Sequence, residues 1–415
     1  LPIVGIRLLN RETTLIFPEE REARNALRSD IERNGYHTLF EAIYKLPKLP
    51  RQVATPERGP GPPGRSIPFF PSQSSMGKLI GISLPDDDPD LHQFLRDSKP
   101  AFDLAATILD KEHYLPPYPP ISCKHRANLP RPIRTNILYG TWLAYATAQI
   151  RYWDEPEQAV ETLNTLYKVT KLTRNNTVSF YETTVEWTSY YKRIQNLIRE
   201  SDDPTLINNI EKMLQDQTIP FDDMQHLLHH NLVLLDEALM MHEIAESYGK
   251  AFEPDFEDHI DQISLQNTVH FIRQDLPNLQ ILADQPLAKV QQWLKTSDWD
   301  NVFFAGHLDS QIMMNIASSL TAAHIDNAMH QATLLAINIE RYQKDLGRYP
   351  NTLNDLIPGY LSEISDSPAT QKPYVYQKQQ DFYLLSEQPI QRLQWDGKTT
   401  HSATYRYVEP KDFPE

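Results

Sequence analysis

The sequence predicts a mainly α-helical protein: an irregular helical bundle or solenoid-like body, followed by a small C-terminal α+β module. In this module one long helix is expected to pack on an antiparallel sheet. Three observations support this fold class. Helical apolar spacing dominates residues 133–346, strand patterns are few between residues 75 and 340, and aromatic-rich strand patterns follow only after a glycine at the end of the last helical stretch.

These patterns divide the chain into three parts. Residues 1–75 contain an N-terminal helix and a proline- and glycine-rich loop, residues 76–306 form the helical body, and residues 307–415 form the α+β module. In the first part, residues 19–45 are expected to form one continuous helix with a rough apolar face.

The helical body contains one pronounced helical hairpin. Residues 133–152 and 156–173 are its two predicted helices, and Trp153-Asp154-Glu155 forms the connection between them. The hairpin is similar to a tetratricopeptide unit, but only one unit is present, so no repeat array is predicted. The other helices expected in the body and the module are 178–201, 204–216, 222–248, 256–273, 288–296 and 307–346.

The turn after the long helix is specified by individual residues. Gly347 can take the left-handed conformation that ends a helix, and Pro350 restricts Tyr349 to an extended conformation. Thr352 and Asp355 have the spacing of a capping box for a short helix.

Arg348, Tyr349 and Pro350 are interpreted as a structural turn, in which Tyr349 fills the gap between the helix and the strands. A binding role for Arg348 is the alternative. Residues 374–376 and 382–385 are predicted strands, and Asp396-Gly397 predicts a second hairpin with residues 404–408 as its return strand.

The composition excludes several classes of protein. The chain has 415 residues, a net charge of −15 and no dense Lys/Arg block, which argues against a nucleic-acid partner. Its 13 glycines form no phosphate-binding motif, and no serine-nucleophile signature occurs. The lone Cys123 excludes an intrachain disulfide.

Residues 339–386 resemble the globular end of type II secretion pseudopilins. They are more similar to a C-terminal module of uncharacterised, membrane-anchored bacterial envelope proteins, whose early segment is similar to Asn34-Gly35-Tyr36. The resemblance implies an N-terminal anchor before Leu1, a periplasmic or envelope location, and envelope or secretion proteins as partners. Asp366-Ser367-Pro368-Ala369 departs from the family's Asp-Pro-Phe-like turn, so a cation or packing role of that turn is not carried over.

Ionisable residues at helical spacing are the candidates for chemistry. Asp222, His226 and His230 form a stripe on one helix face, and two histidines four residues apart can chelate zinc. The alternative is a polar helix face, because no His-Glu-x-x-His motif is present. Further candidates on the long helix, which could approach this stripe in space, are His307, Asp309, His324, Asp326 and His330.

The leading hypothesis is therefore a non-enzymatic, envelope-associated interaction or scaffold protein linked to a secretion or pilus-like system, without a cofactor. The first alternative is a metal-dependent hydrolase that uses the stripe at Asp222, His226 and His230 with zinc or iron. The second is a helical scaffold without ties to secretion. Trp187, with Tyr190 and Tyr191, is expected in the core, with a ligand-binding groove as the alternative.

Overall fold

The structure, a computed structural model, confirms a mainly helical fold with a small C-terminal antiparallel sheet. It describes residues 24, 26–27, 30, 32–48, 89–115, 135–174, 180–220, 285, 289, 292, 307–380, 382–393, 400–403 and 406–408. The helices are α3 (Gly35–Lys45), α5 (Pro89–Asp97), α6 (Lys99–Ala106), η1 (Thr107–Asp110), α7 (Thr135–Arg151), α8 (Pro156–Arg174), α9 (Phe180–Glu200), α10 (Pro204–Asp216), α15 (His307–Leu346) and η3 (Leu353–Leu356). The strands are β1 (Val375–Lys378), β2 (Tyr383–Ser386), β3 (Ile390–Leu393), β4 (Thr400–Ala403) and β5 (Arg406–Val408).

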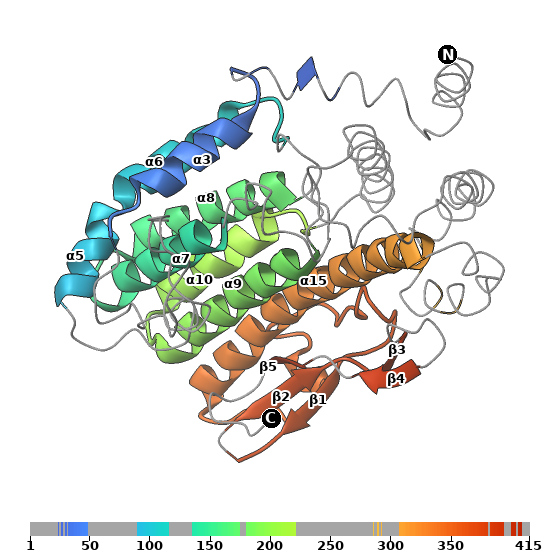
Figure 1. Cartoon of the computed structure of the whole chain (residues 1–415). Helices are drawn as coiled ribbons and strands as arrows, with labels where there is room; N and C mark the ends of the chain where they lie inside the picture. Colours follow the sequence, from blue (N-terminus) through green and yellow to red (C-terminus); the bar gives the residue numbers. More distant parts are fainter. Residues whose placement is uncertain are drawn as a thin grey trace, which may run out of the picture.

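The helices form a layered stack with the sheet at one side (Figure 1). Helices α7 to α10 occupy the centre, and α3, α5 and α6 cover the side remote from the sheet. Helix α15 lies against α9 on one side and against the C-terminal strands on the other. It therefore joins the helical body to the sheet, which α9 also contacts at β5.

The predicted hairpin is present as α7 and α8. Its connection contains Asp154 at φ 56°, and the amide of Glu155 donates to the carbonyl of Gln149 across 2.8 Å. The rings of Trp187, Tyr190 and Tyr191 are buried in the core beside this hairpin rather than lining an open groove. The elements that pack on α9 cover these aromatic rings.

The C-terminal turn ends the 40-residue helix α15. Gly347 follows with φ 68°, and Thr352 and Asp355 form a capping box around η3. Strands β1, β2 and β5 form an antiparallel sheet in the order β1-β2-β5, and β3 pairs with β4 in a separate ribbon.

Two predicted elements differ from the structure. The return strand of the second hairpin is β4, whereas residues 406–408, placed in that role by the sequence, form β5 and pair with β2. In the antiparallel pair of β3 and β4, Leu393 lies opposite Thr400, so the midpoint between the two strands falls between positions 396 and 397. The return strand therefore begins at Thr400, earlier than predicted.

The second difference is the helix expected over residues 19–45. Glu32 and Arg33 lie in a turn, and Asn34 takes extended backbone angles (φ −99°, ψ 112°) before α3 begins at Gly35. An asparagine side chain that accepts a hydrogen bond from the following amides competes with helical continuation, which explains the break. The predicted helices at 222–248 and 256–273 lie outside the described residues, and of the one at 288–296 only Lys289 and Gln292 are described, as helical.

Replacing Gly347 with alanine should lower the free energy of unfolding by about 1 kcal/mol, because a side chain at φ 68° is strained. No atom lies within 4 Å of the added Cβ, so the loss measures backbone strain rather than a clash. Urea denaturation provides the measurement. Gly359→Ala, where a Cβ also meets open space but φ is not positive, is the matched control and should change stability by less than about 0.5 kcal/mol. Equal losses for both variants would contradict this account.

Candidate functional site

The predicted metal stripe cannot be placed. Asp222, His226 and His230 lie outside the described residues, and the side chains of His307 and Asp309 are likewise not described. Within the described residues, no group of three or more His, Cys, Asp or Glu side chains is arranged to hold a metal ion. The structure therefore provides geometry only for the remaining candidates on α15.

His330 is buried where α15 meets α9 and α10. Its Nδ1 lies 3.0 Å from the hydroxyl of Tyr191, and the imidazole also bonds to the backbone of Leu214. Burial, together with a smaller effect of the nearby Lys171 ammonium, lowers the pKa of His330 to about 4. The ring is therefore neutral near pH 7 and joins three helices.

His324 is also buried and lies earlier in α15 than His330. It bonds to the backbone of Pro368 in the turn before β1, and burial lowers its pKa to about 4. Asp326, between the two histidines in sequence, is also buried. The two histidines hold α15 against its neighbours, a structural use of side chains that the sequence presented as candidates for chemistry.

A buried carboxylate joins α15 to both the body and the module. Glu340 is 3% exposed; its Oε1 accepts from Nε of Arg199 on α9, and its Oε2 accepts from the hydroxyl of Tyr349, each at 3.4 Å. Tyr383 of β2 also bonds to this carboxylate. Burial raises the pKa of Glu340, and the guanidinium of Arg199 partly opposes that rise.

The turn at Gly347–Pro350 is built around Tyr349. Its ring lies 5.1 Å from that of Tyr383 in an edge-to-face contact, between α15 and the sheet. Arg348 is exposed. Thus Tyr349 fills the gap between helix and strands. The Arg348 guanidinium contributes to lowering the pKa of Asp355, after the larger effect of the hydrogen bonds that this carboxylate accepts from the amides of Asn351 and Thr352.

The turn that contains Ser367 and Thr370 is held by the buried carboxylate of Glu387. The Ser367 hydroxyl donates to Glu387, and the Thr370 hydroxyl donates to the same carboxylate across 2.7 Å. Ser367 also accepts from the amide of Ala369 at 3.1 Å. Hydroxyl and amide donors therefore organise this turn.

The opposite side of the molecule is organised by Asn34. Its side-chain oxygen accepts from the amides of Tyr36 (3.1 Å) and Leu115 (3.0 Å), and its amide nitrogen donates to the carbonyl of Leu115 (2.9 Å). Gly35 packs closely beside it, since an added Cβ would lie 3.1 Å from Cβ of Ile108. Asn34 and Gly35 therefore join the start of α3 to the segment after η1.

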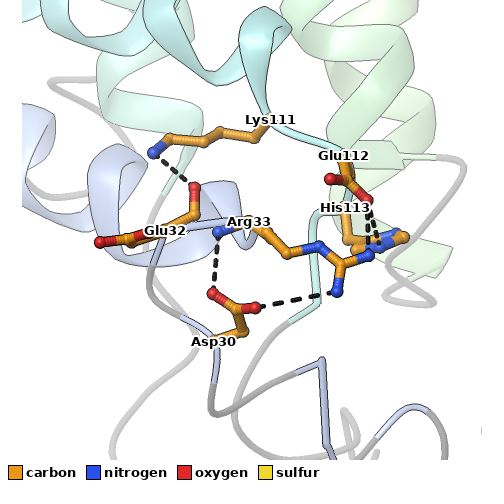
Figure 2. Close-up of polar contacts among 6 residues, drawn as sticks. All are labelled: Asp30, Glu32, Arg33, Lys111, Glu112 and His113. Carbon is orange, nitrogen blue, oxygen red and sulfur yellow. Dashed lines mark hydrogen bonds and ion pairs between the residues drawn. The ribbon is translucent and has the colours of Figure 1, made fainter.

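An exposed charged cluster surrounds this junction (Figure 2). Arg33 pairs with Glu112 at 2.6 Å and with Asp30 at 3.9 Å, and Lys111 donates to the backbone carbonyl of Glu32 across 2.7 Å. The carboxylate of Glu32 points away from Lys111.

A row of aromatic rings extends from this junction along α3. Tyr114 is buried and lies 5.9 Å from Tyr36, which lies 6.4 Å from Phe40, which in turn lies 4.7 Å from Tyr44. Exposure increases along the row, to 40% for Phe40 and 59% for Tyr44. We call Tyr36, Phe40 and Tyr44 the aromatic row. The aromatic residues at every fourth position are visible in the sequence, but they were not predicted to form a surface.

No family model, curated protein or solved structure matches this chain. Among the described helices, none is long and apolar enough to cross a membrane.

Lowering the pH from 6.5 to 4 should destabilise the protein through its buried histidines. An unfolded histidine binds a proton near pH 6.5, whereas folded His324 and His330 do so only near pH 4. Their contribution is complete above pH 6.5 and is lost as the pH falls towards 4, by on the order of 3 kcal/mol for each ring.

The measurement is the free energy of unfolding from urea titrations at pH 7.5, 6, 5 and 4, for the wild type and for His330→Gln. The glutamine keeps hydrogen-bonding groups but cannot titrate in this range. The variant should lose less stability than the wild type between pH 6.5 and 4. Parallel pH profiles would show that His330 is not the group responsible.

Proposed function

We propose that this protein is a non-enzymatic, envelope-associated interaction or scaffold protein, whose partners belong to a secretion or pilus-like system. The observation that supports it most is the aromatic row, because partly exposed aromatic side chains grouped on one helix are typical of protein-binding surfaces. The assignment to the envelope is supported by the resemblance of residues 339–386 to pseudopilin-like modules.

The use of ionisable groups in the described residues agrees with an interaction role. His330, His324 and Glu340 are buried and bonded to neighbouring elements, so they serve packing rather than presenting chemistry to a ligand. The exposed apolar side chains, by contrast, include two successive members of the aromatic row. This division favours binding over catalysis.

The proposal is tested in the native host with the full-length protein carrying a photocrosslinking amino acid at position 44. The expected result is a defined adduct with an envelope protein, identified by mass spectrometry, in cells whose envelope fraction holds the protein. The same amino acid at exposed Lys372, in the module on the far side of the molecule, is the control and should give no such adduct. A cytosolic protein without adducts at position 44 would overturn the proposal.

Elemental analysis of the same purified protein separates the hydrolase alternative. Zinc or iron at one equivalent, lost when His226 and His230 are both replaced by alanine, would favour a metal-dependent hydrolase. Metal that is substoichiometric, or unaffected by the double substitution, would leave the interaction role as the better account.

A further inference from the structure

Asn34-Gly35 is the only Asn-Gly pair in the chain, and this kind of pair is chemically labile. The backbone nitrogen of the glycine can attack Cγ of the asparagine, because glycine has no Cβ that hinders the approach. The new N–Cγ bond closes a five-membered succinimide ring, and the bond from Cγ to the side-chain nitrogen breaks. Ammonia leaves with the proton that the glycine nitrogen gives up, and water then opens the ring to aspartate or isoaspartate.

The folded protein opposes each step of ring closure. The amide of Gly35 donates to the carbonyl of His113 across 2.8 Å, so the proton that must leave is engaged. At ψ 112° of Asn34 the Gly35 nitrogen is turned away from the side chain, and closing the ring requires a large rotation about the Cα–C bond. Asn34 is 1% exposed, and its side-chain amide is fixed by three hydrogen bonds to Tyr36 and Leu115. The reaction therefore requires that Asn34 separate from the segment after η1.

The same junction requires both members of the labile pair. The three hydrogen bonds need a side chain with an acceptor and a donor, which asparagine supplies, whereas ionised aspartate supplies acceptors only. A Cβ at position 35 would lie 3.1 Å from Cβ of Ile108, so the close approach favours glycine. The contacts that protect the pair thus also explain why this sequence occurs there.

We propose that Asn34 is a self-modification site that acts as an irreversible switch. It deamidates when the start of α3 separates from the segment after η1, and the product prevents the two from joining again. The proposal is independent of the proposed function, because it concerns the chemistry of this junction and not the partner of the protein.

The product cannot restore the native contacts. An aspartate at position 34 places an oxygen where the side-chain nitrogen now donates to the carbonyl of Leu115 at 2.9 Å, so two acceptors face each other. Holding a proton on this carboxyl at neutral pH costs free energy, because an aspartate in water has a pKa of about 3.9. Isoaspartate adds a CH₂ group to the backbone between residues 34 and 35, which displaces Gly35 from the carbonyl of His113.

The rate of deamidation at Asn34 tests whether separation is required. The full chain is incubated at pH 7.5, either folded or unfolded in urea, and peptide mapping by mass spectrometry gives the initial rates of aspartate and isoaspartate formation. The folded wild type should react at least about 100-fold more slowly than the unfolded chain, because local opening must come first.

Two matched variants show where the opening occurs. Ile108→Val removes one buried carbon beside Gly35 and should accelerate deamidation of the folded protein about fivefold. Ile337→Val is the same change at an equally buried position of α15 and should leave the rate unchanged. Equal rates for folded and unfolded wild type, no acceleration by Ile108→Val, or equal acceleration by both variants would overturn the requirement for separation at this junction.

The variant Asn34→Asp carries the expected product and tests the irreversible step. Hydrogen exchange should be at least about tenfold faster than in the wild type in the peptides that contain the amides of Gly35 and His113, which join the two segments. Asn351→Asp makes the same charge change at an exposed position and should leave this exchange unchanged. Exchange at the wild-type rate in Asn34→Asp would overturn the switch.

Discussion

The burial of one carboxylate constrains how the C-terminal module meets the rest of the molecule. Glu340 is enclosed between α9, the turn after α15 and β2, and each of these elements supplies it with a donor: Arg199, Tyr349 and Tyr383. A buried charge is tolerated only where such donors surround it, so the three elements must keep these positions relative to α15. We infer that Glu340 determines the arrangement of these elements more than it adds net stability.

The two sides of the molecule use polar groups differently. Around α15 they are buried and join helices to the sheet, as His330 and Glu340 do. At the remote side, Asn34 joins α3 to the segment after η1, while charged side chains remain exposed. Leu39, Ala42 and Ile43 form the buried face of α3, so Phe40 and Tyr44 lie at its exposed side.

Sequence reasoning succeeded where a local rule determines structure. The spacing of apolar residues gave the full extent of α15, and glycine and capping chemistry located the turn after it. It failed where the outcome depends on contacts between distant residues. Asn34 interrupts a helical pattern through bonds to Leu115, and the strand at residues 406–408 pairs with β2 rather than with its nearer neighbour.

The candidate sites show the same division. The histidines of α15 were visible in the sequence, but their burial, which depends on Tyr191 and Pro368 far along the chain, was not. The four-residue spacing of the aromatic row was equally visible, yet helical spacing alone does not say which face is covered. The Glu340 cluster carried no local signal, since its donors are separated from it by up to 141 residues.

The most direct measurement is a double-mutant cycle between Glu340 and Tyr383, using Glu340→Gln and Tyr383→Phe with unfolding free energies from urea denaturation. If the carboxylate on α15 holds β2 in place, the loss of unfolding free energy in the double variant should be smaller than the sum of the losses in the two single variants. The difference should be at least about 1 kcal/mol. Additive effects, within about 0.4 kcal/mol, would show that helix and strand are positioned independently of this carboxylate.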